Sequence, residues 1–164
     1  MYTMVMEFRE GDRVLLLGSS KEVEGNSKIA LKKIDTFFYK NIFEATRFFE
    51  LAKKKSSFDV VVDNGFSQYL HKRELPRFYT YLSRILKFKG VLYQTVLSTE
   101  SDVCKKRCPK RKWTYLDKNY VRFSLKNELK DFIEANFRID NFEKSSYGDD
   151  VYHKIKAVND MRKF

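Results

Sequence analysis

The sequence lacks several features that would assign it to a class at once. It has only two cysteines, two prolines and no low-complexity tract in 164 residues, so it is not a disulfide-stabilised secreted domain. No apolar run approaches the roughly 18–20 residues that cross a bilayer. The start, MYTMVMEFREGD, has no basic flank followed by an apolar segment, unlike a signal peptide. We therefore expect an intracellular, cytoplasmic protein that does not associate with membranes.

Metal-ligand spacing is also missing. Cys104 and Cys108 are too few for a complete zinc site, and neither His71 nor His153 has the spacing of a metal ligand. We expect no metal ion, and the two cysteines are interpreted as ordinary thiols, with a short-loop disulfide as the alternative.

Positive charge is abundant. Lys and Arg total 33 against 22 Asp and Glu, giving a formal net charge of +11. Such an excess favours contact with nucleic acid or another polyanion, although it also serves solubility alone. The length and a hydrophobic fraction of 43% predict one domain over residues 1–164 with a sizeable core. The sequence says nothing of the oligomeric state.

Apolar runs and helical periodicity alternate along the chain. The pattern predicts an α/β fold: a Rossmann-like, mostly parallel sheet with helices on both faces and a C-terminal antiparallel hairpin. Residues 1–10 are expected to form a short helix or arm, and SSKEVEGNS (19–27) a loop. Gly90 is expected to end the second helix, and Ser124 to cap the third. The expected strands are 13–18, 28–35, 58–65 and 91–98, the helices 41–55, 72–90 and 124–137, and the hairpin strands 138–146 and 150–160.

In such sheets the ligand lies outside the carboxyl ends of the strands. The segments that deserve a functional reading are therefore residues 18–20, Asp35, residues 63–66 and residues 97–100.

The order of these segments resembles that of class I S-adenosylmethionine-dependent methyltransferases. The most distinctive block is FDVVVDNGFSQYLHKRELPRFYTYLSRILKFKGVLYQTVLS (58–98), which is similar to the fourth strand, the following helix and the fifth strand of that family. The segment YVRFSLKNELKDFIEANFRIDNFEKSS resembles the family's last helix and final hairpin. RVLLLGSS falls where the family carries its glycine-rich first motif, as in VLDLGCGTG. Leu16 replaces the acid of that motif, and Ser20 and Glu22 stand where further glycines would be.

The resemblance implies S-adenosylmethionine as cofactor and identifies candidate cofactor-binding residues. The backbone at Gly18 and Ser19 would line the cofactor, Asp35 would accept hydrogen bonds from the ribose hydroxyls, and Asp63 would lie near the methionine amino group. Each has a structural alternative: Gly18 ends a strand, Asp35 is a helix cap or loop acid, and Asp63-Asn64-Gly65 is an ordinary turn. Glu22 would bring unfavourable negative charge near the methionine carboxylate.

The functional hypothesis is an S-adenosylmethionine-dependent methyltransferase of unknown substrate. No catalytic residue is assigned, because methyl transfer depends largely on positioning two reactants. The alternative is a non-catalytic module that binds nucleic acid or protein on a decayed methyltransferase fold.

A basic loop follows the expected fifth strand. It has six basic residues in the nine of CKKRCPKRK (104–112), and Trp113 and Tyr115 follow closely. Basic charge beside aromatic rings suits phosphates and stacked bases, so the 104–115 loop is the candidate nucleic-acid contact; the alternative is a solvated loop with Trp113 folded onto the core. The candidate substrate-binding residues are Lys105, Lys106, Arg107, Lys110, Arg111 and Trp113.

Overall fold

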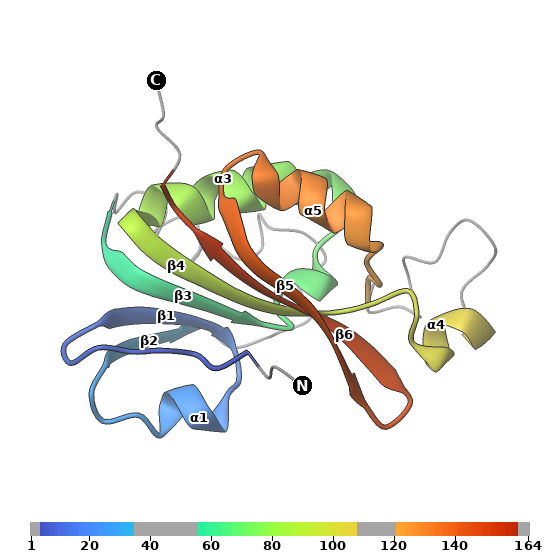
Figure 1. Cartoon of the computed structure of the whole chain (residues 1–164), viewed down its shortest axis with the longest axis horizontal. Helices are drawn as coiled ribbons and strands as arrows, with labels where there is room; N and C mark the ends of the chain where they lie inside the picture. Colours follow the sequence, from blue (N-terminus) through green and yellow to red (C-terminus); the bar gives the residue numbers. More distant parts are fainter. Residues whose placement is uncertain (1–3, 35–55, 108–120, 161–164) are drawn as a thin grey trace.

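The computed structural model describes residues 4–34, 56–107 and 121–160. Their strands form one six-stranded sheet in the order β2-β1-β3-β4-β6-β5 (Figure 1). The strands are β1 (Arg13–Gly18), β2 (Ala30–Ile34), β3 (Phe58–Asn64), β4 (Leu86–Leu97), β5 (Arg138–Tyr147) and β6 (Asp150–Val158). The α-helices are α1 (Lys21–Glu24), α3 (Leu75–Ile85), α4 (Asp102–Arg107) and α5 (Lys126–Glu134), with short 3-10 turns at Ser67–Tyr69 and Lys72–Glu74.

The strand pairing confirms the predicted fold class. β1 pairs in parallel with β2 and β3, and β3 pairs in parallel with β4. β6 runs antiparallel to both β4 and β5, so the C-terminal hairpin completes the sheet as expected. The strand expected over residues 28–35 is present as β2, Ala30–Ile34. Asp35, at the end of the expected strand, and the helix expected over residues 41–55 lie outside the described residues.

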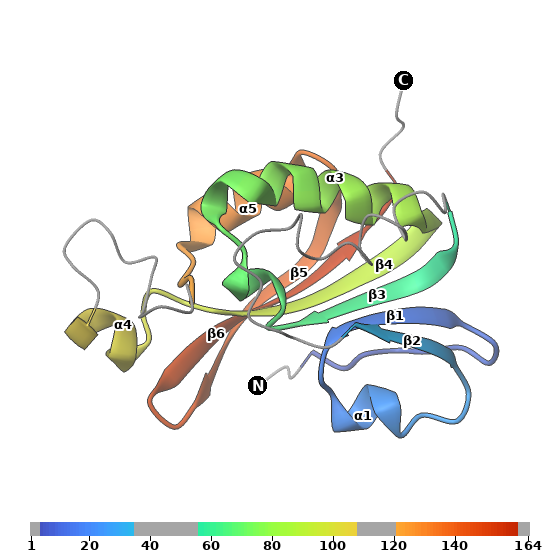
Figure 2. The same cartoon turned by 180° about the vertical axis from the view of Figure 1, so that it is seen from behind.

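The sheet separates two apolar layers because side chains alternate along each strand. Leu15, Leu17 and Val61 face α3 and α5 in the larger cluster. On the opposite face of the sheet, strand residues such as Val14 and Leu16 pack against Val23 of α1. The N-terminal arm, with Met4, Met6 and Phe8, covers the same face. Both views show α3 and α5 on one side of the sheet and α1 on the other (Figures 1 and 2).

The predicted end of the second helix at Gly90 was wrong. Helix α3 ends at Ile85, and Leu86 already belongs to β4 opposite Phe58. Leu86 is 1% exposed, so core packing draws this residue into the sheet. Gly90 instead lies where the backbone is tightly packed. A Cβ there would lie 2.8 Å from the Lys87 carbonyl oxygen of the same strand and 3.1 Å from the Asp59 carbonyl oxygen of β3, so the glycine also allows β3 to approach closely.

Two other local predictions need correction. The expected loop 19–27 contains the single-turn helix α1, whose N-cap is Ser20. Helix α5 has Leu125 rather than Ser124 at its N-cap, since Ser124 forms a β-bridge with Ser98. The residues of the N-terminal arm that are described, beginning at Met4, are non-helical. In the described parts of the chain, no helix combines the length and the apolar character needed to cross a bilayer.

Candidate functional site

A cavity of about 450 Å³ opens at the carboxyl ends of the parallel strands. After β1 the chain moves outward to β2, whereas β3 lies on the other side of β1. The strand order therefore reverses between β1 and β3, which is the point where open α/β sheets bind their ligands. The cavity volume also falls within the range of small-molecule sites, about 300–1,000 Å³.

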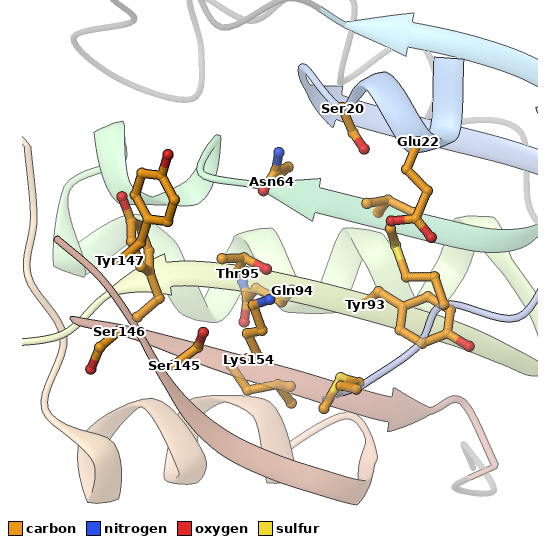
Figure 3. A pocket seen from close by; sticks show the side chains of 15 residues that line it. Ser20, Glu22, Asn64, Tyr93, Gln94, Thr95, Ser145, Ser146, Tyr147 and Lys154 are labelled. Carbon is orange, nitrogen blue, oxygen red and sulfur yellow. The ribbon is translucent and has the colours of Figure 1, made fainter. Parts of the chain in front are cut away.

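The walls of this cavity come from both halves of the sheet (Figure 3). Ser20 and Glu22 come from the segment after β1, Asn64 from the end of β3, and Thr95 from β4, while the hairpin supplies the opposite wall. The lining residues are Met4, Met6, Ser20, Glu22, Val62, Asn64, Tyr93, Gln94, Thr95, Ser145, Ser146, Tyr147, Tyr152, Lys154 and Ile155.

The turn after β1 is tied to the turn after β3. Gly18 adopts φ 97°, a conformation that L-residues with a Cβ rarely adopt, and it bridges Gly65. The Asn64 Nδ2 donates a hydrogen bond to the Ser19 carbonyl oxygen. Asn64 thereby fixes the backbone that the sequence predicted to line the cofactor.

Ser20 acts as the cap of α1. Its Oγ accepts a hydrogen bond from the Val23 N–H at 3.3 Å, and the Glu24 carboxylate accepts one from the Ser20 N–H at 3.2 Å. The serine that stands in place of a family glycine is thus used to start a one-turn helix.

Asp63 lies behind the cavity floor. Its side chain points to the α3 side of the sheet, opposite to the side chains of its neighbours Val62 and Asn64, and is 0% exposed. Its carboxylate accepts hydrogen bonds from the Phe66 and Ser67 N–H groups at 2.9 and 3.1 Å, and from Gln94. Burial raises the pKa of the Asp63 carboxyl, against these hydrogen bonds, which lower it.

The N-terminal arm closes one side of the cavity. The Glu7 N–H donates to the Tyr93 hydroxyl and the Met4 N–H to the Glu143 carboxylate, both at 3.1 Å. These contacts place Met4 and Met6 against the cavity.

Two charged side chains line the cavity, Glu22 from α1 and Lys154 from β6 (Figure 3). The half-buried Lys154 makes no hydrogen bond or ion pair with any described residue. Lys156, two residues on, pairs instead with Asp140 at 3.5 Å.

The structure brings together only part of the predicted site. Gly18 and Ser19 adjoin the cavity without lining it, and Asp63 lies behind it. Lys105, Lys106 and Arg107 belong to α4, where the two lysines are exposed. Asp35, Lys110, Arg111 and Trp113 lie outside the described residues.

Helix α4 starts beside the hairpin turn. The Asp102 N–H donates to the Asp149 carbonyl oxygen at 3.1 Å, and the Ser101 Oγ bonds to the Val151 backbone at 2.9 Å. Helix α4, which carries the basic residues, is therefore anchored beside the β5–β6 hairpin (Figure 1).

Sequence reasoning missed Thr95, Ser145, Tyr152 and Lys154. The signal for Tyr152 and Lys154 was the alternation of DVYHKIKAV, in which these two residues share one face while His153 and Ile155 take the other. That alternation indicated a hairpin, but it could not show that the polar face looks into a cavity.

His153 lies on the other side of the sheet from Lys154. Its Nε2 donates to the Ser124 carbonyl oxygen at 2.9 Å, and burial lowers its pKa. The ring is neutral at physiological pH and packs edge-on against Phe142. Among the residues placed by the structure, no three His, Cys, Asp or Glu side chains gather closely enough to hold a metal ion.

Comparison with solved structures establishes the fold. A protein from Methanosarcina mazei described as an S-adenosylmethionine-dependent methyltransferase superposes with a TM-score of 0.69 at 17% identity, covering 93% of this chain and 94% of its own. The 1,6-didemethyltoxoflavin-N1-methyltransferase of Burkholderia thailandensis, solved with S-adenosylhomocysteine, gives a TM-score of 0.64 at 12% identity, covering 92% of this chain and 72% of its own.

Not every neighbour is named for methyl transfer. The [4+2]-cyclase SpnF also superposes with a TM-score of 0.64 at 15% identity, covering 92% of this chain and 75% of its own. No protein-family model and no curated protein sequence matches the chain. The chain thus has the class I S-adenosylmethionine-dependent methyltransferase fold, and at these identities the likeness shows the fold alone.

Proposed function

We propose that this protein is an S-adenosylmethionine-dependent methyltransferase that binds its cofactor at the carboxyl ends of β1 and β3. The observation that carries the proposal is the cavity at the strand-order reversal, lined from both sides by residues that follow β1 and β3. The proposal takes residues 1–164 as one methyltransferase domain.

The residues present fit this cofactor in shape and charge. Gly18 gives the turn after β1 a backbone conformation open to close approach. Glu22 on the cavity wall offers negative charge to a ligand whose sulfonium and ammonium leave it with net positive charge. In the proposed arrangement the backbone of Gly18 and Ser19 forms the turn beside the cofactor, and Asp35 accepts hydrogen bonds from the ribose hydroxyls. Asp63 acts from behind the cavity by holding the turn that carries Asn64.

S-adenosylmethionine supplies an electrophilic methyl group that an acceptor takes by in-line displacement. The role of the chain in such a step is to bind and orient the two reactants and to exclude water. The N-terminal arm at Met4 and Met6 covers one side of the cavity and helps to keep water out of it. No catalytic acid or base is assigned.

One observation favours a second candidate, a non-catalytic binding module. Ser20 and Glu24 are engaged in capping the one-turn helix α1, so the glycine-rich motif has been converted into a local structural element. In that case the exposed Lys105 and Lys106 of α4, with Arg107, Lys110, Arg111 and Trp113, would contact nucleic acid or another polyanion.

Calorimetric titration of the full chain with S-adenosylmethionine and S-adenosylhomocysteine tests the proposal. We expect micromolar binding of both ligands at one site per chain, and an increase in Tm with ligand concentration. An absence of binding at millimolar ligand would reject the proposal that the protein is a methyltransferase. Titration with a single-stranded oligonucleotide, repeated at higher salt, would then test the module.

A further inference from the structure

The hairpin side of the cavity carries polar side-chain donors with no hydrogen-bond partner among the described residues. Lys154 of β6 lies between Thr95 of β4 and Glu143 of β5 in the register of the sheet. The Lys154 ammonium, the Thr95 hydroxyl and the Ser145 hydroxyl make no hydrogen bond to any described residue. Tyr152, opposite Ser145, also lines this wall, but its hydroxyl is engaged by the Asp150 carboxylate.

Neither neighbouring acid forms an ion pair with Lys154 among the described residues. Glu143 faces it across the strands, but the Glu143 carboxylate accepts hydrogen bonds from the Met4 N–H at 3.1 Å and from Asn141 Nδ2 at 2.9 Å. Glu22, the acid of the cavity lining, comes from α1 rather than from the hairpin. The half-buried Lys154 ammonium therefore keeps hydrogen-bonding capacity that an anionic ligand group can use.

The two ends of the cavity therefore differ in charge. The end at Ser20, Glu22 and Asn64 adjoins the turn after β1, where the proposed function places the cationic cofactor. The opposite end presents a cation and neutral donors. A cofactor and a second reactant of opposite charge would be sorted to opposite ends of one cavity.

We propose that the methyl acceptor carries a carboxylate or phosphate group, and that Lys154 binds this group together with Thr95 and Ser145. The inference rests on the proposed function, which it extends by naming a substrate class. Lys154 acts as a binding residue that fixes the orientation of the acceptor.

Nuclear magnetic resonance titration of the ¹⁵N-labelled full chain tests this site, with inorganic phosphate and acetate as separate probes. The variant is Lys154→Met, which keeps the stem and removes the charge. The matched control is Lys156→Met, on the same strand and the same face, where the lysine is paired with Asp140.

We expect saturable shifts at the amides of Ser145, Tyr152 and Lys154. Affinity should fall about tenfold in Lys154→Met, since a charge-assisted hydrogen bond is lost, and stay within about twofold in Lys156→Met. Preference for phosphate over acetate, or the reverse, identifies which anion the acceptor carries. Equal affinity in wild type and Lys154→Met, or shifts confined to α4, would overturn the inference.

Calorimetry with S-adenosylhomocysteine separates this inference from the proposed function. We expect wild type and Lys154→Met to bind it equally, because Lys154 lies at the acceptor end. If S-adenosylhomocysteine binds but phosphate and acetate do not localise to Lys154, only the acceptor inference fails. If anions bind at Lys154 and S-adenosylhomocysteine binds neither protein, the anion site stands and the methyltransferase proposal fails.

Discussion

Gln94 of β4 donates a hydrogen bond of 2.8 Å from its Nε2 to the Asp63 carboxylate of β3. The same Nε2 contacts the Ser67 hydroxyl at 3.1 Å, and the Gln94 Oε1 accepts from the Tyr79 hydroxyl at 2.9 Å. This fully buried network joins two central strands to α3 directly behind the cavity floor. It fixes the turn that begins at Asn64, so the cavity wall depends on a polar cluster that does not itself face the ligand.

Replacing Asp63 by alanine should lower the free energy of unfolding by about 3 kcal/mol, because three buried donors lose their acceptor. Urea denaturation at neutral pH measures the loss. Asp63→Asn, which keeps an acceptor for the Phe66 and Ser67 N–H groups, should cost distinctly less. Equal stability of wild type and Asp63→Ala would contradict the structural role assigned to this carboxylate.

The same residue should give stability a distinctive pH dependence. Burial raises the folded-state pKa of Asp63 above its unfolded value, so the native state holds the proton more tightly. The cost of ionising Asp63 is absent below about pH 4 and grows as the pH rises toward the folded pKa. Wild type should therefore lose stability relative to Asp63→Asn over this window as pH increases, as measured by denaturation at each pH.

Asp59, on the same strand, provides a control of opposite sign. Burial raises the pKa of the Asp59 carboxyl. The Arg13 N–H at 2.8 Å and the Lys87 ammonium at 3.1 Å lower this pKa by more than burial raises it, so the net change is a decrease. Its stabilising contribution is present above the unfolded pKa and lost as pH falls through the folded one. Wild type should thus gain relative to Asp59→Asn as pH rises, and matching slopes for both variants would refute the assignment.

Much of the sheet could be predicted from the sequence because its signals were local. Apolar runs closed by polar turns marked β1 and β3, and alternation marked the hairpin, since burial on one or both faces dictates those patterns. The boundary between α3 and β4 could not be predicted. Gly90 imitates a helix stop, whereas the actual change at Leu86 depends on its pairing with Phe58 of a distant strand.

The candidate site was less predictable than the fold. Its position at the strand ends followed from topology, but the direction of each side chain depends on register. Asp63 was the conspicuous acid at a strand end, yet the strand pleat turns it toward α3 and presents Asn64 to the cavity. Lys154 was ordinary in sequence, and the pairing of β6 with β4 gives it a place on the wall.

Gly90→Ala should destabilise the protein by about 2 kcal/mol, because the added Cβ would clash with backbone that cannot easily move. The nearest atoms are the Lys87 carbonyl oxygen at 2.8 Å, the Leu86 Cδ2 at 3.0 Å and the Asp59 carbonyl oxygen at 3.1 Å. Gly148→Ala is the comparison, since no atom lies within 4 Å of its Cβ position and only its φ of +60° is strained, at about 1 kcal/mol. Thermal and urea denaturation would rank the two, and the reverse order would contradict the close approach of strands at Gly90.

Asn64→Ala should weaken S-adenosylhomocysteine binding about tenfold, because the turn after β1 loses its hydrogen bond at the Ser19 carbonyl oxygen. Stability should change little, since Asn64 is exposed. The matched control is Asn26→Ala, which removes an amide that accepts from the Lys28 N–H at 3.0 Å outside the cavity. Calorimetry on all three proteins decides, and equal loss in both variants would rule out a specific role for Asn64.

Glu22→Gln should change the affinity for S-adenosylmethionine, the positively charged methyl donor, more than the affinity for S-adenosylhomocysteine, its neutral product. S-adenosylmethionine carries a sulfonium that S-adenosylhomocysteine lacks, so a carboxylate on the cavity wall should favour the former by attraction across partly solvated space. Removing the charge should weaken the binding of S-adenosylmethionine about threefold more than that of S-adenosylhomocysteine, a change in line with exposed charge pairs.

Calorimetric affinities for both ligands measure this ratio. The charge-matched control is Glu24→Gln, because the Glu24 carboxylate pairs with Lys33 at 2.6 Å. If Glu22→Gln instead strengthened both ligands equally, the Glu22 carboxylate would lie against the methionine carboxylate, as the resemblance in sequence implies, and not near the sulfonium.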